Sequence, residues 1–225
     1  KYVLTGIVLA AILSIPLIGT FFGGGGSSRF SSVTVLTPVG TLDRSIVQLD
    51  LDREQANIIG ELFHNRRVVY GMAVAKGYLD HWNFDFLFLH GDGIMRHHAV
   101  DMGMLYLAEL PFVLLGIYTL IGTRGIPRFV VFLWFLVAPL ASAITTGTPH
   151  PVSALLMVVP LHIFTAIGVV SGLQRVSSIP VKYLIYSLCF LFFMFNFSYY
   201  LHQYYVHTPR EYSQGWQYGY KQVVE

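Results

Sequence analysis

The chain has 225 residues, of which 54% are hydrophobic and only 12% are charged. Soluble domains usually carry about 25% charged residues, so much of this surface is expected to face lipid instead of water. The small net charge of +2 and the lack of a basic cluster argue against a nucleic-acid-binding protein. The single cysteine, Cys189, rules out a disulfide framework and a thiolate metal site within this sequence.

Several apolar stretches occur along the chain, and their lengths are close to the roughly 20 residues that a helix needs to cross a bilayer. Prolines fall inside several of them, which a helix bundle in lipid tolerates, and no strand-like alternation suggests a barrel. The sequence therefore predicts an all-α polytopic membrane protein with about five transmembrane helices. The expected spans are Tyr2–Phe22, about Met104–Gly122, Phe129–Thr145, Val152–Gly172 and Val181–Leu201.

The short connecting loops differ in charge, and this difference predicts their sides of the membrane. Arg124 and Arg128 lie in one loop, and Arg175 and Lys182 in another, while the loop between them lacks Lys and Arg. Basic loops stay on the cytoplasmic side, so residues 23–103 and 202–225 are expected outside a plasma membrane. The organisation that follows is a first span at 1–22, an outer loop domain at 23–103, four helices at 104–201 and an outer tail at 202–225. We expect the tail to begin a further soluble domain.

The outer loop 23–103 carries enough aromatic and branched residues to fold as a small mixed α/β cap. It begins with Gly23–Ser28, which has the composition of a flexible joint, either native or engineered. A helix is expected over Asp50–His64, with its buried face formed by Ile58, Ile59, Leu62 and Phe63. The other expected elements are a strand at Arg29–Thr37, a helix at Val68–Trp82 and an extended segment at 83–89.

The end of this loop gathers titratable groups shortly before the second span. Glycines on both sides of Asp92 allow a tight turn and a close approach of the backbone to a ligand. Arg96 offers a planar fork that suits phosphate oxygens, and His97 and His98 add hydrogen-bond donors. This pattern favours a phosphate or pyrophosphate site at the membrane surface. A plain turn, with Arg and His contacting lipid headgroups or nearby acids, would have the same composition.

Three further polar residues lie in or beside the spans. Glu109 sits within the second span, where a carboxylate is costly, and either pairing with the loop or substrate contact would explain it. His150, in the short outer loop, is a candidate member of the same phosphate-binding cluster. His162 is expected to be a packing residue. No metal-ligand spacing accompanies these histidines, so no metal site is predicted.

The order and spacing of short motifs from residue 62 onward resemble a known family. The chain is similar to bacterial GT-C membrane glycosyltransferases of the dolichyl-phosphate-mannose:protein mannosyltransferase-like and aminoarabinose-transferase-like type. The segments that carry the resemblance are Leu62–Tyr70, Tyr78–Trp82, Phe86–Phe88, Gly91–Gly93 with Arg96 and His97, Gly103–Tyr106, Glu109–Pro111, Ala138–Pro139, Thr148–His150 and Trp216–Lys221.

That resemblance implies transfer of a sugar from a polyprenyl-phosphate carrier to a lipid or protein acceptor outside the cell membrane. It implies a carboxylate that acts as general base on the acceptor hydroxyl, in an earlier outer loop that precedes Lys1, so no catalytic residue is assigned within the chain. Asp92, Arg96, His97, His98, Glu109 and His150 are then expected on the phosphate side of the site. No cofactor follows from the residues, and divalent metal use by the full-length enzyme stays open. The alternative is a non-catalytic membrane subunit or transporter segment whose outer cap docks a partner.

Overall fold

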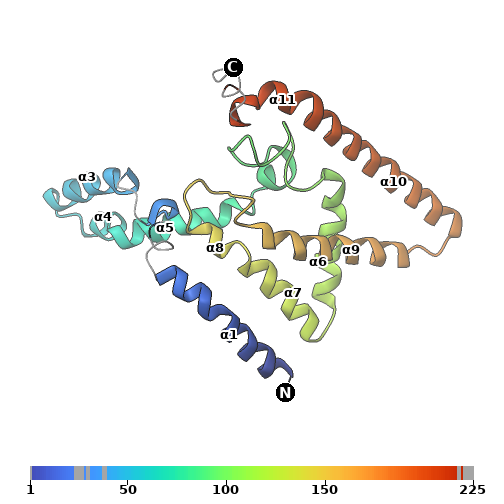
Figure 1. Ribbon diagram of the computed structural model, residues 1–225, viewed down its shortest axis with the longest axis horizontal. Coiled ribbons are helices and arrows are strands. Elements are labelled where there is room, and N and C mark those ends of the chain that lie inside the picture. The colour runs from blue at the N-terminus through green and yellow to red at the C-terminus, as the bar shows by residue number, and fades with distance from the viewer. Residues whose placement is uncertain (1, 23–27, 29–30, 37–39, 217–218, 220–225) are drawn as a thin grey trace. The chain divides into compact units, whose positions relative to one another are not determined.

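The computed structural model describes residues 2–22, 28, 31–36, 40–216 and 219. Over these residues the chain is helical and forms no strand, only an isolated bridge between Thr34 and Thr145. The chain divides into two compact units (Figure 1). Unit 1 comprises Lys1–Val74 with Ile144–Thr146, and unit 2 comprises Ala75–Ala143 with Gly147–Glu225. The glycine-rich joint expected at Gly23–Ser28 lies, apart from Ser28, outside the described residues.

Unit 1 contains α1 (Tyr2–Phe22), α3 (Gly40–Glu54), α4 (Ile58–Phe63) and the first half of α5 (Arg66–Asp80). The strand expected at Arg29–Thr37 is wrong over its described part, because Ser31–Val33 is helical and only Thr34 pairs with Thr145. The mixed α/β cap is therefore not supported, and the described part of the loop is helical. Branched residues favoured a strand locally, but only the segment Ile144–Thr146 lies alongside to pair with it.

The helix expected over Asp50–His64 is also wrong, because the chain breaks it into α3 and α4. Ala56 adopts a positive φ of 52°, and the side chain of Asn57 caps α4 by accepting a hydrogen bond from the amide of Gly60. The break turns the chain, and the apolar residues of α4 do not form a buried face. Instead, the exposed side chains on this short helix are Ile58, Ile59, Leu62 and Phe63.

Unit 2 begins in the second half of α5, a helix that confirms the expectation for Val68–Trp82 to within two residues at each end. The extended segment expected at 83–89 is wrong: Asp85–Leu89 forms a π-helical turn, η1, that buries Phe86, Leu87 and Phe88 together. The remaining elements are η2 (Leu107–Glu109), α6 (Leu110–Gly122), α7 (Ile126–Val137), α8 (Leu140–Ala143), η3 (Leu155–Met157), α9 (Val158–Gln174), α10 (Ile179–His202), η4 (Gln203–His207), α11 (Thr208–Glu211) and η5 (Ser213–Trp216).

The centre of unit 2 is the pair α6 and α9, which cross closely because each has a glycine at the contact. Gly116 of α6 lies against the backbone of Phe164, and Gly168 of α9 lies against the backbone of Phe112. Small residues let helix backbones approach in this way in membrane proteins. The buried apolar core continues from this crossing to α7 and η1 through Phe164, Leu161, Val113 and Phe86.

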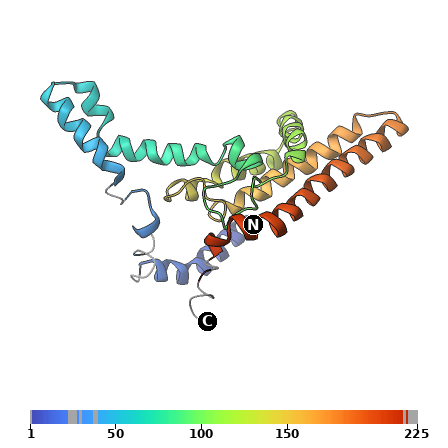
Figure 2. The ribbon, with the colours of Figure 1, turned by 90° about the horizontal axis from the view of Figure 1, so that it is seen from above.

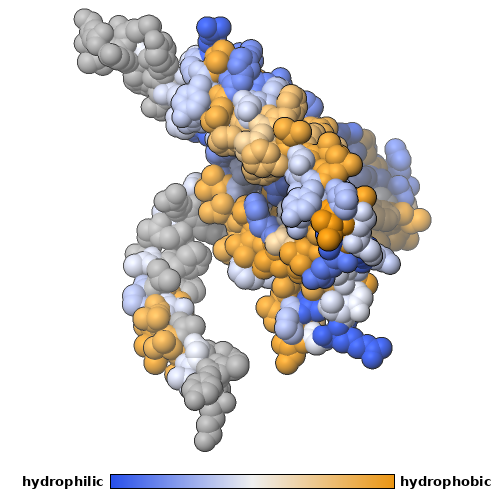
Figure 3. Space-filling view, turned by 90° about the vertical axis from the view of Figure 1, so that its right-hand side faces the viewer, coloured by the Kyte–Doolittle hydropathy of each residue, from blue (hydrophilic) through white to orange (hydrophobic). Residues whose placement is uncertain are grey.

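Three helical segments of unit 2 are long and apolar enough to cross a membrane: Ile126–Ala143, Leu155–Gln174 and Ile179–Glu211. The expected count of five is not supported, because Leu107–Gly122 and the apolar segment Ala11–Thr20 of α1 are shorter. Apolar side chains cover a broad area of the surface in the space-filling view (Figure 3), and none of the residues of α7 or α10 is buried. Such exposure is normal for a lipid-facing helix and costly in water.

Candidate functional site

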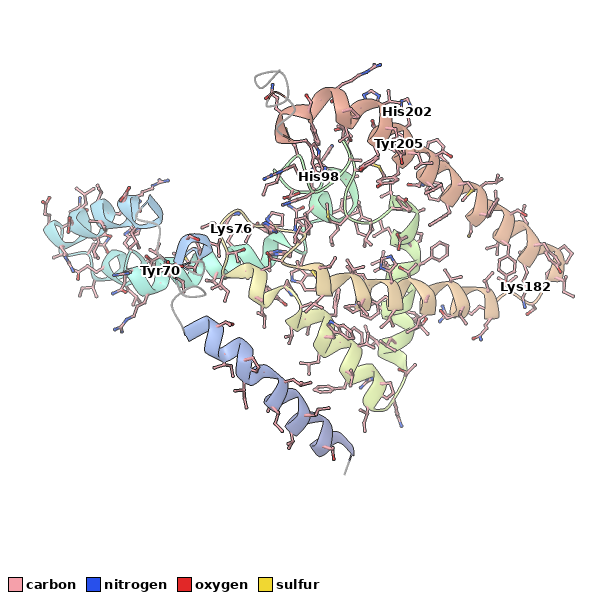
Figure 4. The ribbon with its side chains drawn as sticks, in the orientation of Figure 1. Tyr70, Lys76, His98, Lys182, His202 and Tyr205 are labelled. Atoms are coloured by element: carbon pink, nitrogen blue, oxygen red, sulfur yellow. The ribbon has the colours of Figure 1, made fainter. Side chains whose placement is uncertain are left out.

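The loop between α5 and α6 turns back on itself at Gly91. The φ angle of this residue is 75°, and a Cβ atom there would lie 2.8 Å from the ring of His98. A glycine is therefore needed both for the backbone conformation and for the space. The turn directs Asp92 inward, and its side chain is only 1% exposed. Figure 2 shows the backbone of this loop in green, and Figure 4 labels His98, whose ring packs edge-on against Tyr212.

Asp92 and His97 form a buried hydrogen-bonded pair. The Nδ1 atom of His97 lies 2.7 Å from Oδ2 of Asp92, and the His97 side chain is 15% exposed. An ionised carboxylate only accepts hydrogen bonds, so Nδ1 of His97 carries the hydrogen. The second ring nitrogen, Nε2, has no hydrogen-bond partner among residues 40–216. The pair thus fixes one edge of the imidazole.

His98 is held on both ring nitrogens by backbone carbonyl groups. Its Nε2 lies 2.7 Å from the carbonyl oxygen of Asp92, and its Nδ1 lies 2.9 Å from that of Ala99. The ring also lies 3.7 Å from Oδ1 of Asp92, which has no hydrogen-bond partner within the described part of the chain. His98 is therefore fixed in place directly beside the buried carboxylate of Asp92.

The short loop before α9 reaches the same place through His150. The rings of His97 and His150 lie with centroids 4.8 Å apart. The His150 backbone amide donates a hydrogen bond to Nε2 of His81, at 3.1 Å, and the hydroxyl of Ser142 lies 2.7 Å from the same nitrogen. His81 is fully buried, and its Nδ1 donates to the carbonyl oxygen of Gly77. Burial lowers the pKa of His81, which fits a neutral ring that accepts on Nε2.

A cavity of about 450 Å³ with a mixed polar and apolar lining lies beside this loop, between it and the C-terminal end of α10. Arg96, His97 and His98 line one side of it, and the aromatic residues Tyr200, Tyr204 and Trp216 come from α10 and the segments that follow it. The stem of Arg96 passes close to Gly215, where an added Cβ would lie 3.4 Å from Cγ of the arginine. The exposed guanidinium of Arg96 is thus available to an anion in the cavity.

Glu109 lies at the floor of this cavity, buried at the start of α6. One carboxylate oxygen accepts a hydrogen bond from the Tyr106 amide at 3.4 Å, and the other accepts from the Thr165 hydroxyl at 3.3 Å. The nearest histidine is His162 of α9, with Nε2 3.8 Å from the carboxylate. Glu109 therefore pairs with α9, not with Arg96 or the loop histidines.

A second cavity, of about 1020 Å³, continues from the first and is almost entirely apolar. It lies among α6, α9 and α10, and both cavities are lined by Tyr106, Glu109 and His162. The apolar part is walled by Phe112, Val169, Ile185, Leu188, Cys189 and Phe192. Polar and apolar compartments thus meet at Glu109.

The structure brings together most of the residues that the sequence singled out. One cavity is lined by Arg96, His97, His98 and Glu109. Asp92 binds Nδ1 of His97. The His150 ring contacts the His97 ring but does not line the cavity. Sequence reasoning missed His162, expected as a packing residue, whose side chain is 55% exposed and lines both cavities. No sequence signal identifies His162, because its proximity to Glu109 arises only from the contact of α6 with α9.

Within the described residues, no group of three or more His, Cys, Asp or Glu side chains is arranged to hold a metal ion. The histidines near the loop instead have separate partners: His81 binds Gly77 and Ser142, and His90 binds Asp85. No protein-family model, curated protein or solved structure matches the chain.

Proposed function

We propose that this chain is part of an integral-membrane glycosyltransferase that transfers a sugar from a polyprenyl-phosphate donor to an acceptor on the outer face of the membrane. The observation that carries the proposal is the junction of the two cavities at Tyr106, Glu109 and His162. The lining of the first compartment includes a guanidinium and imidazoles, and the walls of the second are mainly apolar. A ligand with a phosphate at one end and a long hydrocarbon tail at the other suits both compartments together.

The polar compartment suits phosphate by charge and by hydrogen-bond geometry. Arg96 provides a fork of donors with a fixed positive charge, and the imidazole of His98, whose nitrogens contact backbone carbonyl groups, lines the same cavity. The buried acid of the cavity, Glu109, is bound to Thr165 and Tyr106 and lies at the apolar junction. A phosphate near Arg96 would therefore lie closer to this positive charge than to the carboxylate of Glu109. As leaving group, that phosphate gains negative charge, which fixed cations stabilise.

The ends of three helices support the outer location of the cavity. Its walls come from the start of α6 at Glu109, the start of α9 at His162 and the end of α10 at Tyr200. The opposite ends of these helices carry the basic loops, with Arg124 after α6 and Arg175 after α9. Lys182 and His202 mark the two ends of α10 in Figure 4. With basic loops in the cytoplasm, the cavity opens on the other side.

Cys189 gives a direct test, because it lines the apolar compartment and reacts with maleimides only when it is accessible. The full-length protein is placed in proteoliposomes, treated with N-ethylmaleimide, and modification of Cys189 is followed by mass spectrometry. We expect a long-chain polyprenyl phosphate to slow the modification. The free polyprenol is expected to protect less at equal concentration, and inorganic phosphate is expected not to protect.

The matched variants are Arg96→Ala and Arg210→Ala, since Arg210 is an exposed arginine of α11 outside both cavities. Loss of a charge-assisted contact is worth about 1.5–3 kcal/mol, so Arg96→Ala is expected to raise the protecting concentration about 10- to 100-fold. Arg210→Ala is expected to behave as the wild type. Equal protection by polyprenol and polyprenyl phosphate would overturn the phosphate site. Protection without transfer from a polyprenyl-phospho-sugar would leave a lipid-binding subunit instead of an enzyme.

A further inference from the structure

We infer that α4 of unit 1 is an interfacial helix, whose apolar face inserts into the surface of the lipid bilayer while Arg66 and Arg67 bind lipid phosphates. The inference concerns unit 1 alone and does not depend on sugar transfer. It starts from an apolar surface that the described residues of the chain leave uncovered. The side chains that form this surface are Ile58, Ile59, Leu62 and Phe63.

The direction of the apolar face is fixed by the packing of α4 on α3. Gly60 is buried against the carboxylate of Asp52 in α3, and the ring of His64 binds the same carboxylate. Ile58 and Leu62 lie two positions before and after Gly60, which puts them about 200° around the helix from it. Their side chains are 81% and 64% exposed. The contact that holds α4 in place therefore turns its apolar side chains away from α3.

The surface of α3 differs from that of α4 in chemistry. Its exposed apolar residues are interspersed with charged ones, and Asp50 and Arg53 pair with each other at 3.7 Å. Such a mixed surface is normal in water. On α4 the exposed large side chains are apolar, and the acid of this helix, Glu61, is partly buried. A contiguous apolar surface of this kind marks contact with a membrane or with another protein.

Two arginines decide between these partners. Arg66 and Arg67 open α5, three and four residues after Phe63, and both are exposed. Within residues 40–216 neither forms an ion pair with a carboxylate, and the Arg66 guanidinium lies 5.4 Å from the centre of the Tyr70 ring. An apolar helix face followed by arginine and tyrosine is typical of the bilayer interface, where guanidinium groups bind lipid phosphates and tyrosine lies at the headgroup level.

The composition of unit 2 also favours the bilayer as the partner. Three of its helical segments are long and apolar enough to cross a membrane, and α5 joins unit 1 to unit 2 along the chain. With six residues, α4 has a length of about 9 Å and is too short to cross the bilayer itself. A helix of this length with one apolar face can lie only along the membrane surface.

The test measures which quencher reaches a fluorophore on α4 in the full-length protein, held as a single copy in lipid nanodiscs. The native cysteines, including Cys189, are replaced, and the fluorophore is attached through Leu62→Cys or, on the charged surface of α3, through Asp50→Cys. The quenchers are lipids with a nitroxide on the upper acyl chain and iodide in the water. We expect the nitroxide to quench the Leu62 position about 3-fold or more strongly than the Asp50 position, and iodide to show the opposite order.

The arginines are tested in nanodiscs that contain phosphatidylglycerol. Each arginine near an anionic surface is worth about 5-fold in binding. Arg66→Ala combined with Arg67→Ala should therefore lower the ratio of lipid-quenched to iodide-quenched label at Leu62 about 10- to 30-fold. The matched control combines Arg44→Ala with Arg53→Ala, which removes two exposed arginines of α3 and is expected to leave the ratio unchanged. In nanodiscs of phosphatidylcholine alone, the two double variants are expected to behave alike.

A second labelled position on the same face, Ile59→Cys, guards against a local effect at Leu62. Iodide quenching at both positions as strong as at Asp50 would show that the face lies in water and would overturn the inference. Shielding of both positions from nitroxide and iodide alike would overturn it too, since another segment of the protein would then cover α4. An equal loss of lipid quenching in the two arginine double variants would overturn the phosphate contacts of Arg66 and Arg67.

Discussion

Gly116 of α6 lies directly against the backbone carbonyl of Phe164 in α9, with no room for a Cβ atom between them. The ring of Phe164 is fully buried and packs edge-on against Phe135 of α7, with centroids 5.0 Å apart. This single crossing therefore sets the separation of α6 and α9 and holds α7 against them. It also fixes one wall of the apolar compartment, whose lining includes residues of both α6 and α9.

Substitution of Gly116 by alanine is expected to destabilise unit 2, because the added methyl group overlaps the Phe164 backbone. Overpacking of this kind costs about 1–3 kcal/mol. The control is Gly122→Ala in the same helix, where a Cβ atom would meet no other atom within 4 Å. Thermal unfolding in detergent is the measurement. Equal unfolding midpoints for the two variants would show that the helices do not cross at Gly116.

The buried His81 predicts a pH dependence of stability with a definite sign. Burial lowers its pKa in the folded protein below the ordinary value of 6.5. The unfolded chain then binds more protons between these two values, so stability rises with pH. The contribution of His81 is complete above about pH 6.5 and is lost as the pH falls toward the folded pKa. The wild type should therefore unfold at a higher temperature than His81→Gln at about pH 8, and this difference in unfolding midpoint should narrow toward about pH 5. A difference that widens as the pH falls would contradict a neutral buried ring.

In unit 1, Asp52 is expected to hold α3 against α4. Its carboxylate binds the His64 ring at 2.5 Å and the Asn57 amide at 3.0 Å, in space left open by Gly60. Asp52→Ala leaves these partners unpaired and should cost about 1–3 kcal/mol of local stability. Hydrogen exchange of residues 58–63 should accelerate accordingly. Asp50→Ala is the control, because Asp50 is exposed and its ion pair with Arg53, at 3.7 Å, is worth less than about 1 kcal/mol.

Helices with continuous apolar composition were the part of the fold most readable from the sequence. The expected spans at Val152–Gly172 and Val181–Leu201 overlap α9 and α10, because lipid-facing helices carry their signal in every residue. The strand at Arg29–Thr37 and the apolar face of Asp50–His64 were wrong because these short segments depend on tertiary partners. The hydrophobic periodicity of the sequence does not predict that Ala56 takes a positive φ or that Asn57 caps a new helix.

The candidate site was predictable in its residues but not in their roles. The cluster of Asp92, Arg96, His97 and His98 in one loop was visible as composition. The orientation of each side chain depends on contacts that are distant in sequence, such as the ring of Tyr212 against His98. His162 could not be separated from a packing residue, because its role comes only from the approach of Glu109 across the α6–α9 contact.

The two glycines that flank Asp92 provide a final paired prediction. Gly91 has a φ of 75° and lies against the His98 ring, whereas a Cβ atom on Gly93 would meet nothing within 4 Å. Gly91→Ala strains the backbone by about 1–3 kcal/mol and must displace His98, whose Nε2 lies 3.7 Å from the Asp92 carboxylate. We therefore expect sugar transfer to fall about 10-fold or more in Gly91→Ala, with Gly93→Ala close to wild type. Transfer rates and unfolding midpoints are measured for both variants. Equal transfer by the two would show that the tight turn at Gly91 does not hold the Asp92, His97 and His98 arrangement in place.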